Sequence, residues 1–165
     1  VWGARVMANA HVLISSQTLG STVTSVTFNS FSGYRDLRLV IAGTTTTNTV
    51  DAIVLQFNSD TASNYSAVWA TGDGSSATSS SQATTYVSAG VIGTSQSVTT
   101  IDIMDYSQTD KHKTLIARGN TPGWGTRMVA GRWASTSAVT SFVVKTEAGL
   151  TFSVGNTFYL YGVLA

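Results

Sequence analysis

The stretch LRLVI at residues 37–41 decides the fold class, because its apolar residues recur at every second position. Its two leucines and Ile41 then share one face of an extended strand, whereas Arg38 lies on the opposite face. The stretch IVLQF at residues 53–57 repeats this alternation, with Gln56 turned outward. Strands of this kind bury one face and expose the other, so they predict an antiparallel sheet with an apolar inner side.

The same period of two recurs along the rest of the chain. Apolar residues with this spacing are Val12 and Ile14, Val26 and Phe28, Tyr65, Ala67 and Trp69, Ile101 and Ile103, Leu115, Val129, Val143, and Phe158 and Leu160. The pattern predicts about ten short strands, separated by clusters of Gly, Ser, Asn and Asp, and no convincing helix. We therefore expect an all-β fold, a single antiparallel β-sandwich that is jelly-roll-like in its connections.

The composition bounds the function as well as the fold. The chain has 165 residues, the size of one domain, and no cysteine, which excludes disulfides and thiolate chemistry. Charged residues make up 10% of the chain, against about a quarter in typical domains, and the formal net charge is +1. So neutral a surface argues against partners held by electrostatics, and we expect no nucleic acid and no membrane as a partner.

The sequence suggests one boundary, near its beginning. Residues 1–10 are expected to form an N-terminal extension or arm, and residues 11–165 a single β-sandwich domain. Met7-Ala8-Asn9 reads like a natural start, so Val1–Val6 is either an upstream extension or an expression remnant. No long apolar region or small-residue cleavage site typical of a secretory signal is visible there, which fits synthesis in the cytoplasm.

Three polar segments are expected to be loops. Thr44–Asn48 links two strong strands, and Gly72–Thr85 is so rich in Ser and Thr that it reads as too polar to bury and mobile. Gly119–Thr126 holds the only proline of the chain and a tryptophan between glycines. Asp73 lies between glycines too, and this favours an Asp-Gly turn, because no series of acidic ligands follows as in a calcium-binding loop.

Groups that could carry catalysis are few. His11 and His112 are isolated, and neither has a second histidine at a metal-ligand spacing. Asp102 and Asp105 are an odd number of residues apart, so on one strand they would lie on opposite faces, whereas glycoside hydrolysis needs two carboxylates in one cleft. No nucleophile motif and no phosphate-binding loop occurs. We therefore expect a protein that is not an enzyme and that has no metal and no cofactor.

The tryptophans are more informative. Trp69 and Trp133 continue the buried faces of their strands, so they are expected in the core. Trp124 lies in a flexible loop, where it could pack back onto its own sheet, or stay exposed to stack on a sugar or anchor a protein interface. Arg127 lies nearby in the sequence and could supply donors. The candidate binding residues, for an interface or a glycan, are Trp124, Arg127, Asn48 and Asp73.

A series of short motifs follows in order along nearly the whole chain from Met7. These motifs are ISSQTLG at residues 14–20, VTFNS at 26–30, YRDLRLV at 34–40, LQFNSD at 55–60, SNYS at 63–66 and FYLYG at 158–162. As an ordered series they resemble a family of small virion proteins of tailed bacteriophages. The resemblance implies a β-sandwich exposed on a virus particle, commonly with threefold packing, and it brings no catalytic residues.

This resemblance leads to competing functional predictions. The first is a non-catalytic virion structural protein, a capsid decoration or cement protein that binds capsid subunits on the outer surface as a homotrimer. The alternative is a tail-fibre or receptor-binding tip module, in which Trp124 and the polar loops contact a host surface glycan. A hydrolase of host polysaccharide is disfavoured, because paired acids are lacking.

The expected partners follow from these functions. They are copies of the chain itself, the major capsid protein or tail proteins and, in the alternative, a host surface glycan. The expected location is the virion surface, on the capsid exterior or the tail, after synthesis in the host cytoplasm.

Overall fold

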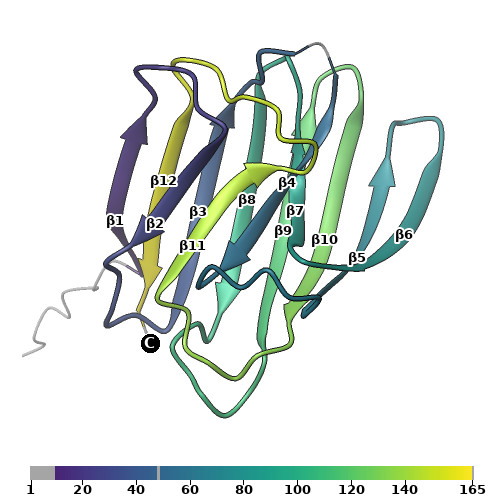
Figure 1. Ribbon diagram of the computed structural model, residues 1–165. Coiled ribbons are helices and arrows are strands. Elements are labelled where there is room, and N and C mark those ends of the chain that lie inside the picture. Colours follow the sequence, from purple (N-terminus) through teal and green to yellow (C-terminus); the bar gives the residue numbers. More distant parts are fainter. Residues whose placement is uncertain (1–9, 48, 165) are drawn as a thin grey trace, which may run out of the picture.

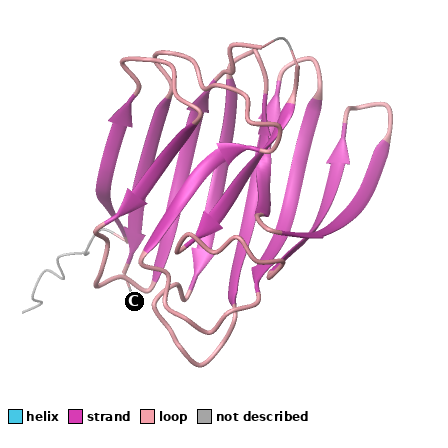
Figure 2. Cartoon of the chain, viewed as in Figure 1, coloured by secondary structure: helices cyan, strands magenta, loops and turns pink. Residues whose placement is uncertain are grey.

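The chain folds into two antiparallel β-sheets packed face to face, as shown by a computed structural model that describes residues 10–47 and 49–164 (Figure 1). Its twelve strands are β1 (His11–Thr18), β2 (Ser25–Asn29), β3 (Asp36–Gly43), β4 (Asp51–Phe57), β5 (Tyr65–Gly72), β6 (Ala77–Thr84), β7 (Val87–Ile92), β8 (Ser97–Met104), β9 (Lys113–Thr121), β10 (Gly125–Trp133), β11 (Ser141–Thr146) and β12 (Thr157–Val163). The described segments between them are turns and loops, with no helix (Figure 2). The predicted all-β sandwich is confirmed, and its jelly-roll connectivity stays a prediction.

The two sheets differ in size. The larger has eight strands in the order β1-β12-β3-β8-β9-β10-β5-β6, and the smaller has four in the order β2-β11-β4-β7. Strand β7, at the edge of the small sheet, packs over β8, β9 and β10 and reaches β5 only marginally. The β5–β6 hairpin therefore extends beyond the small sheet, on the right of Figure 1.

The core lies between the sheets, where the alternating apolar residues face inward. Leu37, Leu39 and Ile41 are each at most 1% exposed, as their period of two predicts. Aromatic rings fill the space under the small sheet, where Phe28 stacks on Phe142 with ring centroids 5.1 Å apart. Burial of apolar surface, at roughly 25 cal/mol per Å², is the main stabilising contribution to such a layer.

The mobile loop predicted over Gly72–Thr85 is wrong, because Ala77–Thr84 forms the edge strand β6 along β5. An edge strand needs a backbone partner on one side only, and threonine favours extended backbone, so a polar segment can form one without being buried. The Asp-Gly turn before it is confirmed. The carboxylate of Asp73 accepts the backbone N–H groups of Ser75 at 2.8 Å and Ser76 at 2.7 Å.

Two other loop predictions are refined by the structure. Strand β9 continues to Thr121 and β10 begins at Gly125, so the predicted loop Gly119–Thr126 shrinks to a tight turn of residues 122–124. Thr44–Thr47 connects β3 to β4 as expected, while Asn48 lies outside the described residues.

Most of the predicted N-terminal arm, residues 1–9, also lies outside the described residues. Ala10, by contrast, belongs to the sandwich, since its carbonyl oxygen accepts the N–H of Leu164 at 3.2 Å and so lengthens the ladder between β1 and β12. The boundary between residues 10 and 11 stays a prediction. In the described part of the chain, no helix has the length and apolar character needed to cross a membrane.

Candidate functional site

Several loops meet at the end of the sandwich where β9 turns into β10, at the top of Figure 1. They enclose a surface pocket of about 620 Å³ between the β5–β6 turn and the β9–β10 turn, and a second of about 300 Å³ between the β9–β10 turn and the segments before β4 and after β7. Trp124 lines both pockets, together with Thr121, Pro122 and Gly123 of the same turn.

The tight turn between β9 and β10 sets the position of Trp124. The Trp124 N–H donates to the carbonyl oxygen of Thr121 at 3.2 Å, which closes the turn. Gly123 and Gly125 have φ of +77° and +133°, which L side chains rarely adopt, and a Cβ on Gly125 would collide with the backbone of Gly72. The glycines on either side of Trp124 therefore let the turn fold tightly against β5.

Arg127 lies between two tryptophan rings. Its Cζ atom is 5.2 Å from the ring centroid of Trp69 and 5.2 Å from that of Trp124, within the range of a cation–π contact. Arg127 is on the inner face of β10, opposite Thr71 of β5, and Trp69 is two residues before Thr71 on the same face. The three side chains Trp69, Arg127 and Trp124 define the feature that we call the aromatic end.

The tryptophan predictions have different outcomes. Trp133 is 3% exposed and in the core, as predicted. Trp69 packs against the core but is only half-buried, so its core assignment is correct in part. Of the alternatives for Trp124, the structure shows the ring folded back over Arg127 and half-buried, which leaves part of it accessible.

The Arg127 charge is not in contact with a counter-charge from any described residue. Among residues 10–47 and 49–164, Arg127 forms no ion pair within 4.0 Å, and its buried Nε has no hydrogen-bond partner. The hydroxyl of the opposite residue, Thr71, is also buried without a partner. Burial lowers the pKa of Arg127, and the carboxylates of Glu147 and Asp51 only partly oppose this effect from a distance.

Those two carboxylates are occupied by other donors. Glu147 Oε1 accepts the Tyr86 hydroxyl at 2.5 Å and the Gln82 amide at 3.1 Å. Asp51 accepts the N–H groups of Ala52 and Ala148, each at 2.8 Å. Burial, followed by the contact with Glu147, raises the pKa of Tyr86. Sequence reasoning missed this network because it links a supposed loop, β6, to segments far away in the chain.

The other predicted binding residues have separate positions. Asp73 lines the larger pocket together with Trp124, but hydrogen bonds from Ser76 and Ser75 hold its carboxylate in the turn and lower its pKa. Asp73 therefore shapes the pocket through the turn that it stabilises. Asn48 lies outside the described residues.

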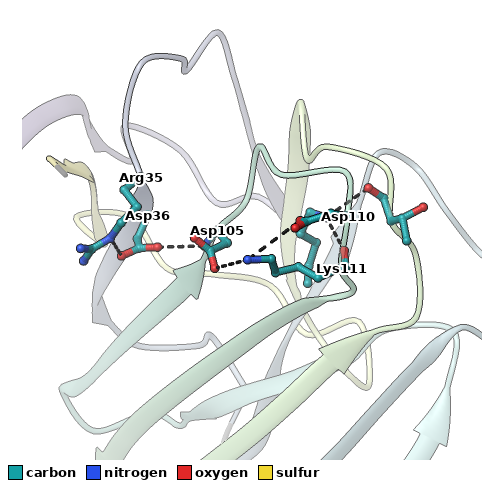
Figure 3. Close-up of polar contacts among 7 residues, drawn as sticks. Arg35, Asp36, Asp105, Asp110 and Lys111 are labelled. Atoms are coloured by element: carbon teal, nitrogen blue, oxygen red, sulfur yellow. Dashed lines mark hydrogen bonds and ion pairs between the residues drawn. The ribbon is translucent and has the colours of Figure 1, made fainter.

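Most ion pairs lie at the opposite end, in a cluster that we call the charged end: Arg35, Asp36, Asp105, Asp110 and Lys111 (Figure 3). Asp36 accepts Arg35 Nε at 2.8 Å and the Asp105 N–H at 2.8 Å. Lys111 Nζ donates to Asp105 at 3.2 Å. In the described chain, no cluster of His, Cys, Asp and Glu could hold a metal ion, and His112 is exposed.

A buried lysine near this cluster was not foreseen. Lys113 is 1% exposed, and its Nζ donates to the carbonyl oxygens of Lys111 at 2.9 Å and Thr136 at 3.3 Å. Burial lowers its pKa. Its place beneath two loops gives it the role of bridging them, with no access to a ligand.

The outer face of the large sheet carries exposed apolar side chains. Val68 of β5, Ile116 of β9 and Met128 of β10 are 59%, 49% and 59% exposed. The exposed Ala70 and Ala130 lie between them in register and complete what we call the outer apolar face. Strand β6 borders this face on one side, and Arg118 beside Met128 and Asp102 beside Ile116 border it with charges on the other.

Comparison with known proteins adds no assignment, since no family model and no curated protein matches the chain. The resemblance to phage virion proteins stays a prediction from the sequence.

Proposed function

We propose that this chain is a non-catalytic structural protein of a bacteriophage virion, a capsid decoration or cement protein that acts by adhesion. The observation that carries the proposal is the outer apolar face. Contiguous exposed apolar surface is typical of sites where one protein binds another, and Val68, Ile116 and Met128 provide it on the outer side of the large sheet. The few charges of the chain make such contacts insensitive to salt.

The neighbouring edge strand supports the same proposal. Edge strands are commonly protected by charges, prolines or bulges, yet the eight residues of β6, Ala77–Thr84, include no charge and no proline. Its free backbone groups can pair with a strand of a second copy or of a capsid subunit. We propose that copies of the chain assemble as a homotrimer at the capsid exterior, with the major capsid protein or tail proteins as partners.

The test is assembly of the full chain with itself and with capsids that lack it. We expect a native mass three times the chain mass of 17.3 kDa, and co-sedimentation with capsids. Met128→Lys should abolish both without lowering the thermal stability, because the side chain is exposed. Thr126→Lys, on the same face of the same strand and also exposed, is the matched control. A chain that is monomeric and does not co-sediment with capsids contradicts the proposal.

The aromatic end favours a second candidate function, a tail-fibre or receptor-binding tip that binds a host surface glycan. Half-buried Trp124 borders two pockets, and an accessible indole face is a common platform for sugar rings. Trp124→Ala should abolish binding to host envelope glycans, whereas Tyr161→Ala, a half-buried aromatic residue on β12, should not. Glycan binding that survives Trp124→Ala excludes this site.

A further inference from the structure

We propose that the aromatic end binds a sugar through its carboxylate, with Arg127 as the cation that holds it. The ligand class is an acidic glycan, one built from uronic or similar sugar acids. This inference deepens the glycan-binding candidate and rests on it. It is argued from the missing partner of Arg127, from the geometry of its guanidinium and from the residues around Trp124.

The first step is the missing counter-charge. Arg127 is half-buried, its Nε has no hydrogen-bond partner, and no described carboxylate is within ion-pair distance. A buried donor without an acceptor is unfavourable, and the charge is not neutralised by any described carboxylate, so an anion at the outer N–H groups of the guanidinium would complement it. Glu147 and Asp51 do not fill this role, because neither carboxylate is within 4.0 Å of the guanidinium.

The second step is the shape of the site. The rings of Trp69 and Trp124 are each 5.2 Å from the guanidinium carbon, so the flat group is flanked by indoles. A ligand anion is then best received at the N–H edge of the guanidinium. A carboxylate is planar and can accept two parallel N–H bonds from that edge, which a neutral hydroxyl cannot do.

The third step is the surroundings of Trp124. The two pockets that it lines carry mainly hydroxyl, amide and backbone groups, including Ser75 and Asn120 in the larger and Thr49 and Ser95 in the smaller. The one carboxylate among these lining residues, Asp73, is held in its turn by Ser75 and Ser76. Such groups match the hydroxyls of a sugar whose ring stacks on the accessible indole. Arg127 lines neither pocket but contacts the same indole at 5.2 Å, so the carboxylate must extend from the stacked sugar past the edge of Trp124 to meet the guanidinium.

The test compares two probes with the same sugar backbone, one with free carboxylates and one in which methyl esters remove their charge. Trigalacturonic acid and its methyl ester are titrated into the full chain by calorimetry, with wild type, Arg127→Gln and the matched control Arg118→Gln. Arg118 is exposed on β9 and faces the outer side of the sheet. We expect the acid to bind wild type and Arg118→Gln equally, and the affinity to fall at least about tenfold for the ester or for Arg127→Gln. Arg127→Lys, which keeps the charge but loses the fork, should give an intermediate loss.

Other outcomes separate the two levels of the claim. Equal binding of the acid and the ester overturns the carboxylate inference and leaves glycan binding in place. If neither probe binds, the inference is overturned. If neutral envelope glycans do not bind either, the glycan-binding candidate is excluded as well. Equal loss in Arg118→Gln shows nonspecific charge attraction and also overturns the inference. If Arg127→Gln does not fold, the acid and ester still decide on wild-type protein.

Discussion

The two ends of the sandwich treat charge in opposite ways. At the charged end, Asp36 accepts donors from Arg35 and Asp105, and Lys111 reaches Asp105 in turn. At the aromatic end, Arg127 contacts two indole rings and has no ion pair with any described residue. Strand β9 joins the two ends across nine residues, which span ~30 Å at ~3.3 Å per residue.

The difference indicates that the charges at one end stabilise the fold, whereas the charge at the other end stays free to bind a ligand. The charged end uses its carboxylates to hold the loop between β8 and β9 against the start of β3, so its charges are mutually satisfied. The aromatic end fixes a cation in place with rings, which hold its orientation without neutralising it. Removing a charge should therefore lower stability at the first end and leave it little changed at the second.

The largest effect is expected for Asp36→Ala. Asp36 is 7% exposed, and its removal leaves the Asp105 N–H and the Arg35 guanidinium without their acceptor. We expect the free energy of unfolding to fall by about 1–3 kcal/mol, measured by urea denaturation. Asp110→Ala is the control, because that side chain is 72% exposed and its ion pair is long, at 3.9 Å. Equal losses in both variants would show that the network does not support the loop.

The next effect is a pH dependence of the stability that arises from Asp60, whose carboxylate accepts a hydrogen bond from the Trp133 indole. Hydrogen bonds from the Asn64 side chain, the Trp133 indole and the Ala62 N–H lower the pKa of Asp60 below 3.8. Because the folded pKa is below the unfolded one, the stabilisation is complete above pH 3.8 and is lost as the pH falls through the folded pKa.

Asp60→Asn tests this assignment. The variant should lose about 1 kcal/mol of stability at neutral pH and should lack the part of the acid dependence that Asp60 contributes. Urea midpoints of both proteins between about pH 2 and pH 6 measure it. Parallel curves for variant and wild type would place the acid-sensitive group elsewhere.

A smaller effect on stability is expected at the aromatic end, for the substitution Arg127→Met. Arg127→Met keeps the unbranched stem between Trp69 and Trp124 and removes the unpartnered Nε. The lost cation–π contacts and the removed desolvation penalty oppose each other, so stability should change by less than about 1 kcal/mol. A loss as large as that of Asp36→Ala would mean that Arg127 is a structural support.

Sequence reasoning reached those parts of the fold that depend on local periodicity. Leu37, Leu39 and Ile41 are buried as predicted. Their burial could be predicted because the alternation of faces along a strand depends only on residues close together in the sequence. Strand β6 was missed, because an edge strand of Ser and Thr is stabilised by backbone pairing with β5, and no apolar alternation marks it. Lys113 was missed too, since its burial depends on loops that meet only in the folded chain.

The candidate site shows the same limit. Trp124 and Arg127 are three residues apart, so their proximity could be predicted from the sequence. Trp69 joins them only through the pairing of β5 with β10, which no local pattern encodes. Its period of two indicated the core, and the structure places it where the core ends, because the small sheet reaches β5 only marginally.

The smallest effect concerns Arg38 and Asp102, which face each other across β3 and β8 on the outer side of the sheet. Arg38 donates through Nε at 2.5 Å and Nη2 at 3.0 Å, yet the side chains keep 38% and 24% of their surface exposed. A double-mutant cycle with Arg38→Gln and Asp102→Asn should give a coupling energy of about 0.5 kcal/mol that shrinks in high salt. Arg118, which faces Thr100 in the next pair of strands, has no carboxylate opposite, so Arg118→Gln serves as the salt control.

A coupling energy above about 2 kcal/mol that does not change with salt would mean that solvent does not screen the Arg38–Asp102 pair. The exposed fraction of a side chain would then not indicate how strongly its charge interacts. The difference between Arg127 and the charged end would in that case depend only on the missing partner of Arg127.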